Sequence, residues 1–120
     1  MATAEYKTFD SPDEVREFEK ARVELVNIGS GQVGRITVEP GWRWTTHMKD
    51  MAGTDLCQAP HFQYVMQGTI HVVMDDGTEL DIGPGSVSVL PPGHDAWVVG
   101  DEPAVAVDWA GASVWGKGGA

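Results

Sequence analysis

The chain has 120 residues, the size of one domain, and its formal net charge of −10 makes it strongly acidic. Its 8 lysines and arginines are dispersed, whereas nucleic-acid binding needs clustered cations, so that class of partner is disfavoured. An acidic membrane surface would also repel the protein, and no apolar run approaches the length of a bilayer span. Because the first residues are polar and Cys57 is the single cysteine, we expect a cytoplasmic protein without an intrachain disulfide.

The first predicted element is a short helix or an ordered arm. Ser11 can cap a helix, Pro12 suits its first position, and Glu14 completes a capping-box spacing. Apolar residues three apart follow, as on one face of a helix. We therefore expect residues 1–21 to form an N-terminal arm or a short helix.

The next part of the chain changes to short β-strands separated by glycine- and proline-rich turns. Asp76 and Gly77 lie between two alternating runs and predict a hairpin. Short strands at this spacing are typical of a sandwich or barrel, so we expect an all-β domain over residues 22–110. The predicted strands cover residues 22–28, 33–38, 62–66, 70–74, 79–82, 87–90, 96–99 and 105–109.

Two segments lack this strand pattern. Residues 50–59, which include Cys57, are expected to form a loop that is either a cover over one end of the domain or a plain surface excursion. Residues 111–120 are small and glycine-rich, so we expect a flexible C-terminal tail. Trp115 is unusual in such a tail and either docks on a neighbouring part or has no role.

Two segments punctuated by glycine and proline each carry histidine near a turn. In the first, five residues separate Gly41 from His47, and six residues separate His61 from Gly68. Histidine is the commonest metal ligand, so two such segments in one small domain favour a shared site. The second segment has an equally regular spacing, set by Gly85, Pro91, Gly93 and His94.

These spacings resemble the two motifs of the cupin superfamily over most of the expected β-domain. The resemblance implies a small single-domain cupin with a jelly-roll β-barrel. His47 stands at the first histidine position of the family, and His61 stands at the position of its glutamate. The other two histidine positions hold Lys49 and Ala96, and His94 lies two residues before Ala96.

Strand periodicity predicts which side chains converge inside such a barrel, because residues two apart share a face. It allows an interior set of His47, His61 and His94, with Gln63 as a fourth member. Three imidazoles suit a divalent transition metal such as iron, zinc, manganese, nickel or copper better than magnesium or calcium. We therefore expect a metal site at His47, His61 and His94, with His61 and Gln63 as the catalytic residues.

The same parity predicts the walls of a substrate pocket. Side chains that share a face with the histidines would point inward, and one aromatic residue lies near the mouth. Apolar walls with a few polar groups suit a small organic molecule, and they favour an aromatic or polyketide-like substrate over a sugar. The expected pocket residues are Arg43, Gln63, Val65 and Trp97.

Other aromatic and apolar residues fall on the opposite faces of these strands. They would pack an outer layer or a dimer seam, and the resemblance implies a homodimer because cupins commonly pair through such faces. The residues that parity places outward in this way are Trp42, Trp44, Phe62, Tyr64 and Met66.

Three further polar residues are expected outside the metal site. His71 is out of phase with its apolar neighbours and should point outward. Lys49 should point away, because an ammonium group repels a metal ion. Cys57 is interpreted as a plain buried or loop thiol in preference to a soft metal ligand.

Three functions agree with this pattern. Our prediction is a metal-dependent enzyme acting on a small organic molecule, and the resemblance leaves its reaction open among oxygenase, isomerase, lyase and cyclase chemistry. The first alternative is a non-catalytic module that binds or senses a small molecule, motivated by Lys49 and Ala96 at ligand positions. The second is a metal-free enzyme with His61 as general base.

Overall fold

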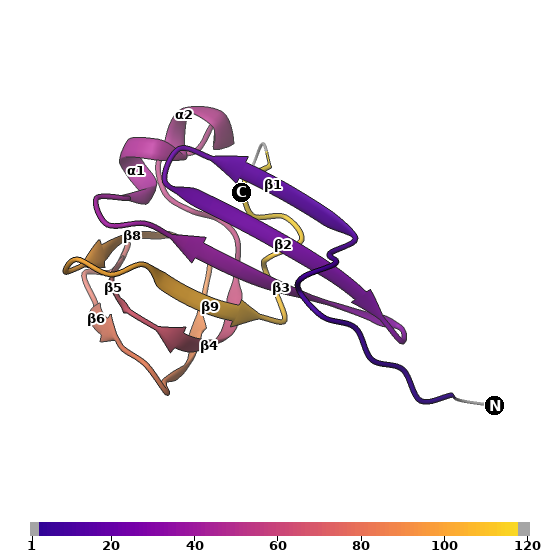
Figure 1. Ribbon diagram of the computed structural model, residues 1–120. Coiled ribbons are helices and arrows are strands. Elements are labelled where there is room, and N and C mark those ends of the chain that lie inside the picture. Colours follow the sequence, from indigo (N-terminus) through magenta and orange to yellow (C-terminus); the bar gives the residue numbers. More distant parts are fainter. Residues whose placement is uncertain (1–2, 118–120) are drawn as a thin grey trace.

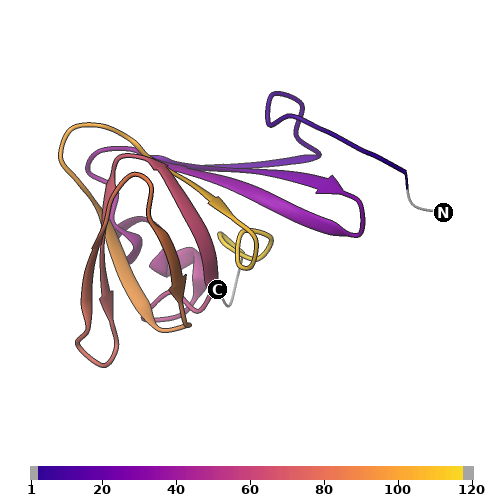
Figure 2. The same ribbon diagram turned by 90° about the horizontal axis from the view of Figure 1, so that it is seen from below.

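The structure, a computed structural model that describes residues 3–117, consists of two antiparallel β-sheets that curl around a common core (Figures 1 and 2). The larger sheet has six strands in the order β1-β2-β3-β9-β4-β7, and the smaller has three in the order β6-β5-β8. The strands are β1 (Glu14–Phe18), β2 (Ala21–Ile28), β3 (Gly31–Val38), β4 (His61–Gln67), β5 (Thr69–Met74), β6 (Glu79–Ile82), β7 (Val87–Leu90), β8 (His94–Val99) and β9 (Ala104–Asp108). The short helices α1 (Trp44–His47) and α2 (Lys49–Ala52) lie at one end of the sheets (Figure 1).

Alternation along the strands separates the core from the outer surface. In β4, Gln63 and Val65 are buried, whereas Phe62 before them and Met66 after them are each 51% exposed. The side chains of a strand point to opposite faces in turn, so one face of β4 lines the interior. Each strand predicted from the sequence corresponds to a strand of the structure, and the all-β fold is confirmed.

The predicted N-terminal helix is wrong, because residues 14–18 form strand β1 instead. This strand pairs with β2 over its whole length, from Glu14 opposite Leu25 to Phe18 opposite Ala21. The Asp13 carboxylate, directly before β1, accepts a hydrogen bond from the backbone N–H of Asn27 at 2.7 Å. Pairing with the adjacent strand β2 therefore overrides the local capping signals.

The segment before β4 also differs from expectation. Residues 44–47 and 49–52 form the short helices α1 and α2, so the strand parity assumed for this part of the chain does not apply. The loop that follows turns inward at Cys57 and Ala59, which are both fully buried. Of the two expectations for residues 50–59, the structure therefore favours a cover over the interior.

The expected flexible tail is largely packed onto the barrel. Trp115 is only 3% exposed, and its ring lies 6.0 Å from that of Phe18 and 5.9 Å from that of Trp42. Gly34 faces Ala112 so closely that a Cβ atom at Gly34 would collide with its side chain. Of the tail, residues 111–117 are described and residues 118–120 lie outside the described part of the chain.

A helix long and apolar enough to cross a membrane is absent from residues 3–117.

Candidate metal centre

A cavity lies between the inner faces of the two sheets. The cavity is small, with a volume of about 40 Å³, and the whole space between its walls, which includes open solvent, is about 480 Å³. Most of the wall is apolar, so water within it has few hydrogen-bonding partners. The lining residues are Ile36, Val38, Trp42, Trp44, His61, Gln63, Ile70, Val72, Leu90, His94, Ala96, Ala106 and Trp115.

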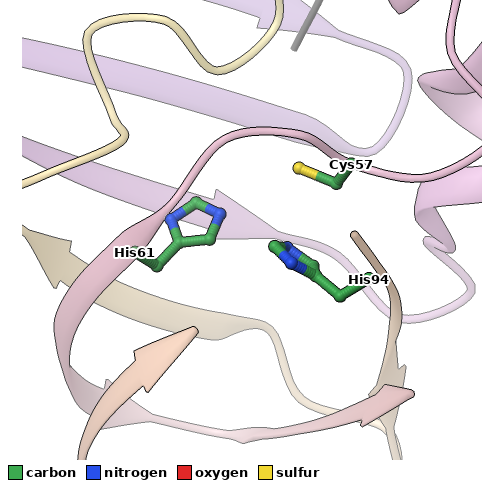
Figure 3. Close-up of side chains that lie close together, drawn as sticks. All are labelled: Cys57, His61 and His94. Atoms are coloured by element: carbon green, nitrogen blue, oxygen red, sulfur yellow. The ribbon is translucent and has the colours of Figure 1, made fainter. Parts of the chain in front are cut away.

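Three buried side chains with metal-ligating atoms converge beside this cavity. The donor atoms of Cys57, His61 and His94 all lie within 4.8 Å of one another, and the two imidazole rings are 5.3 Å apart. Figure 3 shows these side chains facing one another from separate parts of the chain. His61 begins β4 and His94 begins β8, while Cys57 belongs to the inward-turning loop.

Backbone hydrogen bonds hold the loop against β8. The N–H of Cys57 donates to the carbonyl of His94 at 2.8 Å, and the N–H of Gly93 donates to the carbonyl of Cys57 at 2.7 Å. These contacts form an isolated β-bridge between Cys57 and His94. The thiol is therefore positioned next to the imidazole by main-chain geometry.

The imidazole of His61 is oriented by a buried carboxylate. Its Nδ1 is hydrogen-bonded to Asp108, which is itself only 1% exposed. Asp108 also accepts hydrogen bonds from the backbone N–H groups of Ala110 at 2.9 Å and of Phe62 and Gly111 at 3.3 Å. Burial alone would raise the pKa of Asp108, but the contact with His61 and these N–H donors lower it below its ordinary value. Asp108 therefore stays ionised and leaves Nε2 of His61 available.

His94 has a comparable orientation. Its Nδ1 lies 3.0 Å from the carbonyl oxygen of Pro91, which can only accept, so Nδ1 carries the proton and Nε2 is the free nitrogen. Burial and the neighbouring His61 lower the pKa of His94 to about 4. At neutral pH the ring is therefore uncharged, which is the state that a metal ligand needs.

The environment of Cys57 does not suit a nucleophile. Burial raises the pKa of the Cys57 thiol to about 12, and the charge of Asp108 adds to that effect. A catalytic thiol requires a lowered pKa, because the thiolate is the reactive form. A metal ion, in contrast, can displace the thiol proton, so the position fits a soft ligand.

The structure does not bring His47 into this cluster. Strand parity placed it inside, but His47 lies on the short helix α1 and is partly exposed. Its Nδ1 accepts a hydrogen bond from the backbone N–H of Arg43 at 3.1 Å. The group of three donors is therefore completed by Cys57, which the sequence interpretation had set aside.

Of the expected pocket residues, some lie inside the barrel and others lie on its outer face. Gln63 lines the cavity, and Val65 is fully buried in β4 without being one of the described lining residues. Arg43 and Trp97 lie on the outer face, where the guanidinium group of Arg43 sits 4.5 Å from the ring of Trp97 and forms an ion pair with Asp95 at 2.8 Å. The inward direction predicted for Arg43 is therefore wrong, and Trp97, predicted near the mouth, is not among the described lining residues.

The inward and outward positions around Arg43 are reversed from those expected. Trp42 and Trp44 are buried and line the cavity, because the chain around Arg43 pairs with β8 opposite Trp97 and turns its neighbours inward. Phe62, Tyr64 and Met66 do face outward, as predicted.

The remaining polar residues lie away from the donor cluster. His71 contacts Asp81 at 2.7 Å and Glu79 at 2.8 Å on the outer face of the smaller sheet, as its parity predicted. Lys49 forms an exposed ion pair with Asp55 at 3.5 Å. Neither residue takes part in the group formed by Cys57, His61 and His94.

Comparison with solved structures establishes the fold. A cupin 2 conserved barrel domain protein from Salinispora arenicola CNS-205 has a TM-score of 0.59 at 21% identity, with 94% of each chain covered. KdgF from Halomonas sp. has a TM-score of 0.60 at 16% identity, covering 89% of this chain and 91% of that one. The polyketide cyclase RemF from Streptomyces resistomycificus has a TM-score of 0.59 at 17% identity, covering 92% and 80% respectively.

The protein therefore has the cupin fold, and the resemblance seen in the glycine and proline spacing is confirmed at that level. No protein-family model matches the chain, and the search of curated proteins found no match.

Proposed function

We propose that this protein is a metal-dependent cupin enzyme that acts on a small organic molecule inside the barrel. Cys57, His61 and His94 would hold a divalent transition metal. The proposal is supported above all by the convergence of these three donors within 4.8 Å beside an apolar cavity. The fixed Nδ1 contacts of both histidines add support, because they leave one nitrogen of each ring for a ligand bond.

The donor set fits such an ion. One thiolate and two neutral imidazoles suit zinc, iron or copper, and three protein ligands leave a position open for substrate or water. When bound, the metal would act as a Lewis acid on an oxygen atom of the substrate. Gln63 offers an amide in the lining of the same cavity, and tryptophans form part of its apolar wall.

Metal titration tests the proposal. We expect the reduced wild-type protein to bind one equivalent of zinc in calorimetry. His61→Ala and Cys57→Ala should each weaken binding by at least about 100-fold, since each removes a direct ligand. His47→Ala is the matched control, because His47 lies outside the cluster, and it should bind zinc as the wild type does. Absence of stoichiometric zinc in the wild type would refute the site.

Turnover distinguishes the enzyme from a binding module. The metal-loaded protein is incubated with a panel of small aromatic and aliphatic oxo compounds, and substrate loss is followed by mass spectrometry. Consumption that disappears in His61→Ala would support catalysis. A compound that raises the melting temperature but is never consumed would instead favour the non-catalytic alternative.

We also propose that the protein is a homodimer of the cytoplasm, where reducing conditions would keep the Cys57 thiol available. The support for pairing is a group of outward-facing residues on β4, on β7 and directly after the end of β9, which we call the apolar face. Its members are Phe62, Tyr64, Met66, Val87, Val89 and Trp109, all between 39% and 67% exposed.

A further inference from the structure

We propose that Trp42 and Trp44 are specificity-determining residues, whose indole N–H groups donate to the carboxylate of a small single-ring aromatic acid bound in the cavity. This inference rests on the proposed function, because it names the substrate class of the same cavity. Three features of the cavity carry it, namely its unpaired donors, its aromatic wall and its lack of negative charge.

The first feature is a pair of buried donors. Trp42 is 4% exposed and Trp44 is 1% exposed, and both line the cavity. Neither indole Nε1 has a hydrogen-bond partner within residues 3–117. Buried donors are nearly always paired, because an unpaired one loses its hydration without compensation. Two of them on one cavity wall therefore indicate a ligand that supplies acceptor atoms.

The second feature is the shape and chemistry of the wall. Trp42 and Trp115 lie with ring centroids 5.9 Å apart, and the rest of the wall is mainly aliphatic. Such a surface suits a flat apolar body, whereas a sugar would need many more polar partners. The small volume of the cavity, about 40 Å³, favours a single ring over a fused-ring system.

The third feature is charge. None of the described residues that line the cavity is an aspartate or a glutamate. The side chains there that carry polar atoms are His61, Gln63, His94 and the indoles of Trp42, Trp44 and Trp115. Asp108 is turned toward His61 Nδ1 and the backbone N–H groups behind it. A ligand carboxylate would therefore meet donors without a nearby lining carboxylate to repel it.

Calorimetry with benzoate as the probe tests this inference. Toluene keeps the ring and lacks the carboxylate, cyclohexanecarboxylate keeps the charge and lacks the flat ring, and glucuronate carries many hydroxyl groups. We expect zinc-loaded wild-type protein to bind benzoate at least tenfold more tightly than each of the other three. This ranking needs no variant, so it remains decisive if a substitution impairs folding.

The variants Trp42→Phe and Trp44→Phe then remove one N–H group each. Each should weaken benzoate binding at least about tenfold, as expected for one hydrogen bond to a charged acceptor, and should change toluene binding much less. Trp109→Phe is the matched control, because Trp109 is 54% exposed on the outer face, and it should leave both affinities unchanged.

The outcomes separate this inference from the proposed function. If zinc does not bind, the proposed function fails, and the probe ranking and the two variants are measured with the metal-free protein. If zinc binds but benzoate does not, or if the two variants weaken toluene and benzoate equally, the inference is overturned and the metal site stands. Glucuronate binding as tight as that of benzoate would overturn it as well.

Discussion

At the scale of single residues, the candidate centre depends on a carboxylate that does not touch the metal position. Asp108 holds Nδ1 of His61 and is itself held by the backbone N–H groups of Ala110 and Gly111. This arrangement fixes both the tautomer and the direction of the ring. Asp108 is therefore a positioning residue, and its contribution can be measured apart from that of the three donors.

We predict that Asp108→Asn weakens zinc binding by about 10- to 100-fold, because an amide holds the imidazole less firmly and makes it a weaker ligand. Competition against a chromophoric chelator gives the affinity. Glu24→Gln is the matched control. Glu24 on β2 is also a buried carboxylate, but it pairs with Arg35 on β3 at 2.9 Å and is not part of the centre. Equal affinities for wild type and Asp108→Asn would contradict the assigned role.

The residues of the centre differ in how far the sequence could predict them. His61 and His94 were predicted because each begins a regular strand whose parity and preceding turn are visible in the sequence. His47 was misplaced because the chain turns into α1, where strand parity no longer applies. Cys57 and Asp108 reach the site through long-range pairing with His94 and with β4, which no local pattern reports.

At the scale of elements, the N-terminal strand and the C-terminal segment close the barrel together. Arg16 on β1 donates to the carbonyl oxygens of Trp115 and Ser113 at 2.8 Å, and to that of Ala112 at 3.4 Å. These bonds hold the turn that carries Trp115 into the cavity wall. The wall of the candidate site therefore depends on an element far away in the sequence.

We predict that Arg16→Ala lowers the free energy of unfolding by about 1–2 kcal/mol, because the carbonyl groups lose charged donors and Trp115 loses its anchor. Urea unfolding followed by circular dichroism measures this change. Lys49→Ala serves as the control, since Lys49 is 45% exposed and its ion pair with Asp55 lies at the surface, where such pairs contribute at most about 1 kcal/mol. Equal stabilities of Arg16→Ala and wild type would contradict a role for Arg16 as an anchor.

The elements also show where sequence patterns reach their limit. Strands such as β4 were predicted well, because burial of one face makes buried and exposed residues alternate along the sequence. β1 was predicted as a helix, because Ser11, Pro12 and Glu14 match a capping pattern whatever the partner strand is. The packed segment of residues 111–117 was missed for a similar reason, since small residues serve both flexible tails and close contacts such as that of Gly34 with Ala112.

At the scale of the whole molecule, the net charge opposes the association of two copies of the chain, and the apolar face favours it. The formal net charge of −10 repels a second copy. The apolar face carries no charged side chain among its six members, and in it Phe62 lies opposite Val89 and Tyr64 opposite Val87 across β4 and β7. Burying such a surface is favourable in proportion to its apolar area. We therefore expect this gain to exceed the charge repulsion, so that two copies associate through this face.

We predict that the protein elutes as a dimer, with twice the 12.9 kDa mass of one chain, when light scattering is measured during gel filtration at about 0.15 M salt. Val89→Lys should yield monomers, because it places a charge where the contact needs apolar surface. Val99→Lys is the control, since Val99 is 43% exposed on β8 in the other sheet, and it should remain dimeric. Since the repulsion is electrostatic and the attraction is not, the dimer should tighten as salt rises. A wild-type monomer at all salt concentrations, or weaker pairing at high salt, would contradict this face as the interface.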